Sequence, residues 1–163
     1  EITKSDLDSC SIVLGYQSDK VADVIKDLNI NLILNPLWKE GQASSLKAAL
    51  DSLTSSYSDL LIMLGDLPGI KSGHINRIIE EHLSSENRSS KITIPSFKGE
   101  TGNPVIWGKS FFHDLSNLEG DVGGRVLFGQ HPAAINLIEM DDPSVVTDTD
   151  TPEDFDDFLA NRT

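Results

Sequence analysis

The feature of this sequence that most constrains its fold is the apolar run LLIMLG at residues 60–65, which ends on the acid Asp66. A run without polar side chains is typical of a strand buried on both faces of a parallel sheet. In an open sheet of this kind, ligands bind beyond the carboxyl ends of the strands. Asp66 stands at such an end, where it is either a turn residue before Pro68 or a ligand for a metal ion.

Apolar strands alternate with amphipathic helices through the first half of the chain, which predicts an α/β fold with a mostly parallel sheet covered on both faces. The length of 163 residues fits a single domain spanning 1–163. Strands are predicted at residues 11–16, 31–34, 60–65, 91–95, 105–108, 135–140 and 144–150. Helices are predicted from the cap Ser18 to residue 28, from Ser44 or Ser45 to residue 53, at 75–83, at 109–115, as a helix or turn at 120–130, and at 151–162 with Thr151 as the cap.

The charge balance excludes several classes of partner. The net charge of −13 repels nucleic acid and anionic membranes, so we expect neither as a partner. No apolar run approaches the roughly 18 residues that a membrane helix needs. The single cysteine, Cys10, excludes an internal disulfide and a cysteine cluster for zinc, which favours a reducing, cytoplasmic setting.

A second group of acids follows a predicted strand near the C-terminus, where Asp148 and Asp150 close the segment SVVTDTD. If the ends of this strand and of the LLIMLG strand are neighbours, the carboxylates converge on one point. Mg²⁺ is held by one or two carboxylates together with substrate phosphates and water. The alternative is structural, with Asp66 starting a turn and Asp148 capping the last helix.

The DTD triplet is also similar to motifs of other protein classes. An EF-hand loop needs glycine at its sixth position, and this sequence continues instead with Pro152 and Glu153. The pattern DxDx[TV] of aspartyl-phosphate phosphotransferases fails because Pro152 occupies its last position. Sugar-nucleotide glycosyltransferases carry DxD in mid-chain, whereas here it precedes the last helix.

Three glycine-containing segments offer further candidate residues. Gly41 permits close approach of the backbone to a ligand, and Ser44 or Ser45 then opens a helix whose N-terminus suits an anionic group, unless the segment is a plain turn and cap. Residues 97–104 form a loop around two glycines before a strand. In LEGDVGGRVLF, Arg125 either clamps a substrate phosphate or forms a structural pair with Asp121.

Five motifs in order resemble the molybdenum-cofactor nucleotidyltransferase family, and in particular its MocA-type cytidylyltransferase branch within the MobA-like NTP transferases. The resemblance covers nearly the whole chain. It rests on NPLWKEGQASSL (35–46), LGDLP (64–68), GNPV (102–105), GDVGGR (120–125) and DTDTPED (148–154).

The resemblance implies a Rossmann-like, three-layer α/β/α fold and transfer of a nucleoside monophosphate from an NTP to a phosphorylated acceptor, with Mg²⁺ and release of pyrophosphate. CTP is favoured over GTP, molybdopterin is the implied acceptor, and handover to a molybdoenzyme or its chaperone is implied. Asp66 and Asp150 become the catalytic metal ligands. The implied nucleotide-binding residues are Asn35, Gly41, Ser44, Ser45 and Gly65, and the implied acceptor-binding residues are Gly102, Asn103, Pro104, Asp121 and Arg125.

Three departures from the family pattern bear on function. The family has GMSxSL where this chain has Gly41-Gln42-Ala43-Ser44-Ser45-Leu46, and it often has arginine where Thr101 precedes GNP. The family also begins with a strand and a triphosphate-binding loop, LAAGxSxRMG, that has no counterpart before SIVLGY. Because that strand would be central, we expect its absence to leave both neighbouring strands with unpaired backbone groups.

Two functions follow from this comparison. The first is a Mg²⁺-dependent nucleotidyltransferase, and the second is a binding or regulatory module that keeps the fold without the triphosphate loop. A further expectation is that the sequence belongs to a longer protein, which intact-mass spectrometry tests because a measured mass of 17.8 kDa would contradict it.

Overall fold

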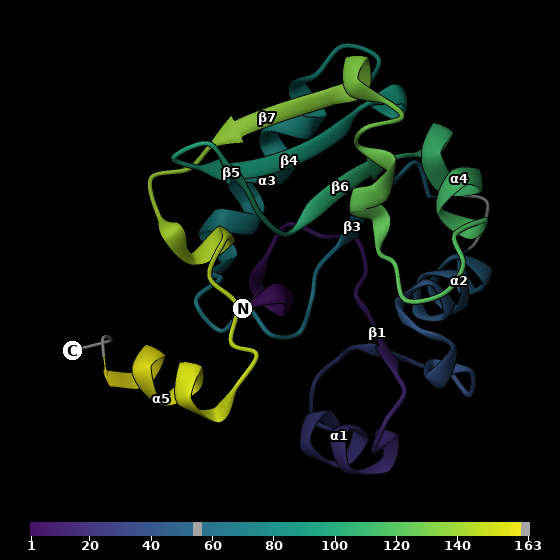
Figure 1. Ribbon diagram of the computed structural model, residues 1–163, viewed down its shortest axis with the longest axis vertical. Helices are drawn as coiled ribbons and strands as arrows, with labels where there is room; N and C mark the ends of the chain where they lie inside the picture. The colour runs from purple at the N-terminus through teal and green to yellow at the C-terminus, as the bar shows by residue number, and fades with distance from the viewer. Residues whose placement is uncertain (54–56, 161–163) are drawn as a thin grey trace.

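The computed structural model describes residues 1–53 and 57–160, so the end of the last predicted helix at residue 162 lies outside the described residues. The larger of its two sheets has five strands, ordered β3–β6–β4–β5 with β7 also paired to β4 (Figure 1). Its strands are β3 (Asp59–Ile62), β4 (Ile92–Phe97), β5 (Glu100–Thr101), β6 (Val105–Gly108) and β7 (Ile135–Glu139). A separate two-stranded sheet pairs β1 (Ser11–Leu14) with β2 (Asn31–Leu34).

The larger sheet is mixed in direction. β7 runs parallel to β4, and β1 runs parallel to β2, as a parallel sheet requires. β6 lies antiparallel to both of its neighbours, β3 and β4, so these two share one direction with β6 between them. The short β5 returns antiparallel to β4 as a hairpin. The α/β class is therefore confirmed, and the parallel direction predicted for the sheet holds for β3, β4 and β7 but not for β5 and β6.

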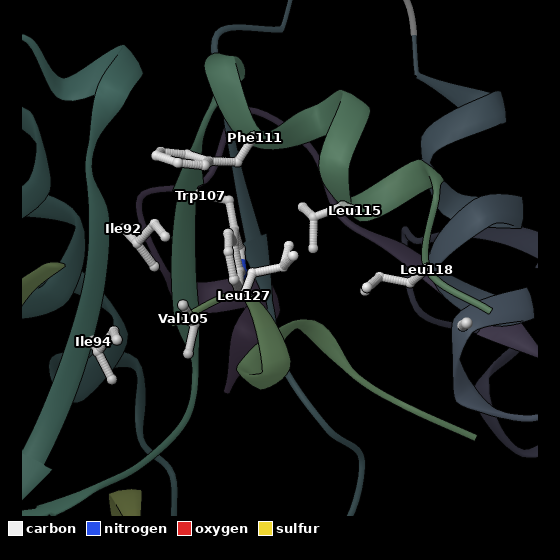
Figure 2. Packing of buried hydrophobic residues seen from close by; sticks show 9 residues of the cluster. Ile92, Ile94, Val105, Trp107, Phe111, Leu115, Leu118 and Leu127 are labelled. Carbon is white, nitrogen blue, oxygen red and sulfur yellow. The ribbon is translucent and has the colours of Figure 1, made fainter. Parts of the chain in front are cut away.

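Helices cover both faces of this sheet, and the alternation along β6 shows why. Val105 and Trp107 belong to a hydrophobic cluster that also includes Leu115 of α4 (Phe112–Ser116) (Figure 2). Leu46 and Leu50 of α2 (Gln42–Ser52) pack against this cluster. The residue between them, Ile106, faces the other cluster with residues of α3 (Ser72–Ser84). Successive side chains of a strand point to opposite faces, so one apolar strand serves both layers.

The unit formed by β1, α1 (Ser18–Ile25) and β2 is covered much less completely, and Figure 1 shows it below the larger sheet. No residue of α1 is buried, and Val24 and Leu34 are 83% and 65% exposed. Among the described strands, β1 pairs only with β2 and β3 pairs only with β6. One edge of β1 and one edge of β3 therefore have no strand partner among the described strands.

The segment 144–150 is not a strand, contrary to the prediction from its β-branched residues. Its start belongs to the 3-10 turn η7 (Pro143–Val145), and the rest is irregular. The last helix, α5 (Pro152–Ala160), follows Thr151 as predicted. The remaining 3-10 turns are η1 (Ile2–Lys4), η2 (Trp38–Glu40), η3 (Arg88–Ser90), η4 (Lys109–Phe111), η5 (Gly124–Leu127) and η6 (Pro132–Ala134). Within the described ranges, no helix is long and apolar enough to cross a membrane.

A buried polar network joins α3 to the start of β3. His82 is 1% exposed, and its two ring nitrogens lie 2.8 Å from the hydroxyl of Thr93 and 3.0 Å from the carboxylate of Asp59. Asp59 also accepts a hydrogen bond from Ser58 and lies 3.3 Å from the guanidinium of Arg88. Burial would raise the pKa of Asp59, but the hydrogen bonds from His82 and Ser58 and the nearby positive charges outweigh it and lower the pKa.

This network predicts that Asp59→Asn lowers the free energy of unfolding by about 1–3 kcal/mol at pH 7, because a buried histidine loses its charged partner. A lowered folded-state pKa stabilises the fold above the unfolded-state pKa of about 3.9 and ceases to do so as the pH falls through the folded-state value. Urea denaturation of both proteins from pH 7 downward should therefore show the difference shrinking below about pH 4.

Asp27→Asn is the matched control, because Asp27 is exposed. It should leave the free energy of unfolding within about 0.5 kcal/mol of the parent at every pH. A difference between Asp59→Asn and the parent that stays constant down to pH 2.5 would contradict the assigned role of the carboxylate.

Candidate active site

Asp66 lies beyond the carboxyl end of β3, in the turn that leads to Pro68. Its carboxylate oxygen Oδ1 is buried and has no hydrogen-bond partner among the described residues. A buried polar atom without a partner is costly and rare in folded proteins. Asp66 can therefore be both a turn residue and a metal ligand, because its Oδ1 has no hydrogen-bond partner among the described residues.

The DTD segment is bonded to the main chain of Asp66. The backbone N–H of Thr149 donates to the Asp66 carbonyl over 2.9 Å, and the Thr149 hydroxyl donates to the same oxygen over 3.2 Å. The flanking residues Asp148 and Asp150 are both exposed. The two acidic segments therefore lie side by side at Thr149, although the second segment is irregular instead of a strand, and the convergence of their carboxylates stays a prediction.

Asp150 is held from its other side by the cap of α5. The Thr151 hydroxyl accepts a hydrogen bond from the Asp154 backbone N–H over 3.1 Å, and the Asp154 carboxylate accepts one from the Thr151 backbone over 2.9 Å. This reciprocal arrangement satisfies two donors at the start of the helix. The exposed Asp150 thus lies between two anchored neighbours, Thr149 and Thr151.

The donor set at this site fits a hard divalent cation. Among the residues that the structure describes, no group of three or more histidine, cysteine or acidic residues could hold a metal ion. Mg²⁺ does not need such a group, because it is bound by one or two carboxylates and completes its shell with water and substrate phosphates. The unpartnered Oδ1 of Asp66 is one carboxylate oxygen available to such an ion, and Asp150 follows Thr149, which is bonded to the main chain of Asp66.

Asn35 connects β2 to α2. Its side-chain amide donates to the hydroxyls of Ser44 and Ser45 over 2.8 and 3.1 Å, and its oxygen accepts from the backbone of Leu37 over 2.9 Å. The residue is 2% exposed. Three of the predicted nucleotide-binding residues therefore lie together, and the side chain of Asn35 holds the other two in place.

The N-terminus of α2 is capped by a distant loop. The helix begins at Gln42, ahead of the predicted caps Ser44 and Ser45, and its cap residue is Gly41 at φ 101°. The Asp121 carboxylate accepts a hydrogen bond from the backbone of Gln42 over 3.2 Å, and the carbonyl of Gly120 accepts one from Ala43 over 3.2 Å. The first two free N–H groups of the helix are therefore occupied by protein, which supports the alternative of a plain turn and cap over an anionic ligand at these groups.

Gly41 is required by this contact. A Cβ atom there would lie 2.5 Å from the backbone carbon of Gly120 and 2.6 Å from the Asp121 backbone. Its φ of 101° is also disfavoured for any side chain. Figure 1 shows the loop that follows α4 passing beside α2.

The GNP segment is attached to the turn that precedes DTD. The backbone N–H of Asn103 donates to the carbonyl of Val145 over 2.8 Å, and Gly102 donates to the carbonyl of Pro95 over 2.7 Å. A Cβ atom at Gly102 would collide with the Val145 carbonyl oxygen. Pro104 is buried and follows a cis peptide bond. These three predicted acceptor-side residues are therefore linked through Val145 to the chain that carries Asp150.

The predicted pair between Asp121 and Arg125 is not formed. Arg125 donates instead to the carbonyl of Thr101 over 2.8 Å, while Asp121 serves as the cap of α2. Arg125 is exposed beside the loop that contains Thr101. Arg125 thus brings a positive charge to that loop from a distant part of the sequence.

Two further positions complete the description of the site. Gly65 is exposed, with no heavy atom within 4 Å of where a Cβ atom would lie, so the structure leaves open space beside Asp66. Thr149 and Val145, which hold the two motifs together, are absent from the residues predicted from sequence. The position of Thr149 between two acids was the available signal for the first, and no local pattern marks Val145.

Comparison with known proteins agrees with this architecture. Rv0371c from Mycobacterium tuberculosis H37Rv, solved in complex with manganese, superposes with a TM-score of 0.77 at 22% identity, covering 98% of this chain and 81% of that chain. The fold and the position of the site define a three-layer α/β protein whose carboxylate site lies at the strand ends. Residues 2–135 match the family model of the MobA-like NTP transferase domain. The chain belongs to that family.

Two curated relatives have named functions. The molybdenum cofactor cytidylyltransferase of Escherichia coli is 24% identical over 158 residues, covering 93% of this chain and 76% of the relative. The purine catabolism protein PucB of Bacillus subtilis is 29% identical over 121 residues, covering 72% of this chain and 56% of the relative. The match to a third curated relative covers 23% of the length of that relative. The chain therefore corresponds to only part of some of the relatives that it matches.

Proposed function

We propose that this chain is the nucleotidyltransferase unit of a Mg²⁺-dependent enzyme that transfers a nucleoside monophosphate from an NTP to a phosphorylated acceptor. In this reaction an acceptor phosphate oxygen attacks the α-phosphorus, the bond from that phosphorus to the bridging oxygen breaks, and pyrophosphate leaves. The observation that carries the proposal is the buried, unpartnered Oδ1 of Asp66 beside the DTD segment. A bound divalent cation would neutralise phosphate charge at these carboxylates.

The protein's own groups contribute by positioning the reactants. Asp66 and Asp150 would hold the cation, and Ser44 and Ser45, which Asn35 holds in place, would contact the nucleotide. The GNP segment and Arg125 would face the acceptor, with Arg125 offering the positive charge that an acceptor phosphate requires. Chemistry of this type proceeds by positioning and charge stabilisation and needs no protein nucleophile.

CTP is the proposed nucleotide and molybdopterin the proposed acceptor, by analogy with the named function of the Escherichia coli relative. The proposal of a divalent metal is supported by the carboxylates of Asp66 and Asp150 and by the manganese complex of Rv0371c. Handover of the product to a molybdoenzyme or its chaperone would follow from that acceptor. The second candidate is a non-catalytic nucleotide- or cofactor-binding module, which would bind the same ligands without releasing pyrophosphate.

Calorimetric titration with CTP and GTP, each with and without Mg²⁺, tests the proposal. We expect metal-dependent nucleotide binding and, with the acceptor added, release of pyrophosphate. Metal-dependent binding without pyrophosphate release would select the binding module. Binding that is unaffected by EDTA would overturn the metal site.

A further inference from the structure

The short turn η7 is packed against two glycines that belong to different segments of the candidate site. A Cβ atom at Gly69, in the turn that carries Asp66, would lie 2.7 Å from the Ser144 hydroxyl oxygen and 3.0 Å from the Ser144 Cβ. A Cβ atom at Gly102, at the start of the GNP segment, would overlap the carbonyl group of Val145. Both segments therefore approach the same turn more closely than a residue with a side chain permits.

Hydrogen bonds and buried contacts extend this junction to the DTD segment. The backbone N–H of Asn103 donates to the Val145 carbonyl over 2.8 Å. The side chain of Val145 is 0% exposed and lies in the same buried cluster as Leu67, which follows Asp66. Further along the chain, the backbone N–H of Thr149 donates to the Asp66 carbonyl over 2.9 Å. The Asp66 turn, the GNP segment and the DTD segment are thus all attached to η7 or to the chain that leaves it.

Asp142 closes this turn from its N-terminal side. Its Oδ1 accepts a hydrogen bond from the Ser144 backbone N–H over 2.8 Å, and its Oδ2 lies 3.7 Å from Nε2 of His74 in α3. The hydrogen bonds from Ser144 hold the pKa of Asp142 below its usual value, so the carboxylate is ionised at neutral pH. An aspartate that accepts from the backbone two residues further on forms an Asx turn, which fixes the local path of the chain.

We infer that Asp142 is a positioning residue of the candidate site, which acts through η7 to hold the Asp66 turn and the GNP segment against the DTD segment. The inference rests on the proposed function, because the quantity that Asp142 would control is the placement of the cation ligands. A metal site needs its ligands held in place by the groups behind them, and loss of such a supporting group typically weakens metal binding by 10- to 100-fold.

Amide hydrogen exchange of the metal-free protein, followed by NMR, provides the first test. Asp142→Ala should speed exchange at the Asn103 and Thr149 amides by roughly fivefold or more, the range for loss of a capping side chain. The Gly108 amide, which donates to Lys91 in the larger sheet over 2.9 Å, should keep its rate. A rate that is unchanged at Gly108 distinguishes local opening at η7 from a general loss of stability.

Two further variants separate the cap from the charge. Asp142→Asn should keep the slow exchange of the parent, because the asparagine side-chain oxygen accepts the same hydrogen bond from the Ser144 backbone. Asp141→Ala is the matched control, since it removes the neighbouring aspartate, whose side chain is 96% exposed. It should leave the rates at Asn103 and Thr149 unchanged.

Cation affinity provides the second test. Mn²⁺ alone, titrated with detection of the free ion by electron paramagnetic resonance, should bind Asp142→Ala at least about tenfold more weakly than the parent. Asp142→Asn and Asp141→Ala should bind it as the parent does. A purely structural role would lower the stability of Asp142→Ala and leave the Mn²⁺ affinity of the folded protein unchanged.

The glycine contact gives a third test that does not involve Asp142. Gly69→Ala should weaken Mn²⁺ binding and speed exchange at Thr149, because the added methyl collides with Ser144. Ser144→Gly removes both colliding side-chain atoms and keeps the backbone N–H that Asp142 binds. The double variant Gly69→Ala/Ser144→Gly should therefore recover Mn²⁺ affinity relative to Gly69→Ala.

The outcomes keep this inference separate from the proposed function. Unchanged exchange at Asn103 and Thr149 in Asp142→Ala, parental Mn²⁺ affinity in that variant, or no recovery in the double variant would overturn the inference. If the parent itself bound no Mn²⁺, the metal site of the proposed function would fail. Local acceleration of exchange at Asn103 and Thr149 in Asp142→Ala would still support the positioning role of Asp142 in that case.

Discussion

Replacing Asp66 by asparagine should lower pyrophosphate release by at least about a thousandfold, the upper range for loss of one charge-stabilising group. The same substitution should remove the metal-dependent part of nucleotide binding in calorimetry. The physical reason is that the buried Oδ1 has no partner among the described residues and is the oxygen available to a cation. Asparagine keeps the shape of the side chain but replaces the carboxylate by a neutral amide.

Stability distinguishes this role from a structural one. A side chain that holds a turn together should destabilise the fold when replaced, whereas removal of the negative charge from a carboxylate with a buried, unpartnered oxygen should leave the free energy of unfolding unchanged or higher. Urea denaturation of Asp66→Asn without metal measures this difference. Asp27→Asn serves as the control for both assays and should change neither. Unchanged turnover in Asp66→Asn, or a loss of several kcal/mol of stability, would contradict the assigned role.

Gly41→Ala should lower the free energy of unfolding by about 1–3 kcal/mol, the range for a side chain in a left-handed conformation. The added methyl would also collide with the backbone of Gly120 and Asp121 and would separate their loop from the start of α2. The Asp121 carboxylate would then no longer accept the hydrogen bond from the Gln42 backbone. Urea denaturation of the variant and the parent measures the difference.

Gly73→Ala is the matched control for this substitution. Gly73 lies in the first turn of α3, and no heavy atom lies within 4 Å of where its Cβ would be. Alanine there should stabilise the protein by about 0.4–1 kcal/mol by restricting the unfolded chain. If Gly41→Ala and Gly73→Ala changed the free energy of unfolding equally, the close contact at Gly41 would have no energetic role.

Local patterns predicted most of the elements but not the direction of all the strands. The alternation of Val105, Ile106 and Trp107 marks a strand between two layers, and both layers are present. Nothing in VIWG states whether it runs with or against its neighbours, so the antiparallel placement of β6 was not predictable from it. The β-branched pair Val145 and Val146 indicated a strand, but Val145 is fully buried against the GNP segment within a 3-10 turn.

The candidate site was predictable to a similar degree. The acid at the end of the apolar run does lie beyond a strand end, where such sheets bind ligands, whereas the DTD segment lies beside it without following a strand. The cap of α2 by Asp121 joins residues 79 apart in sequence, and the bond from Arg125 to Thr101 spans 24 residues. Contacts of this length depend on the path of the whole chain, which short motifs do not specify.

The bond between Thr149 and Asp66 has a consequence for how freely this site can change in sequence. It joins an N–H group to a carbonyl oxygen, so its main component does not depend on the side chain at position 149. Serine, alanine or valine there would keep the two acidic segments in register, and only proline would remove the donor. The register of the two acidic segments is thus set by the main chain, and a change of the side chain at position 149 does not alter it.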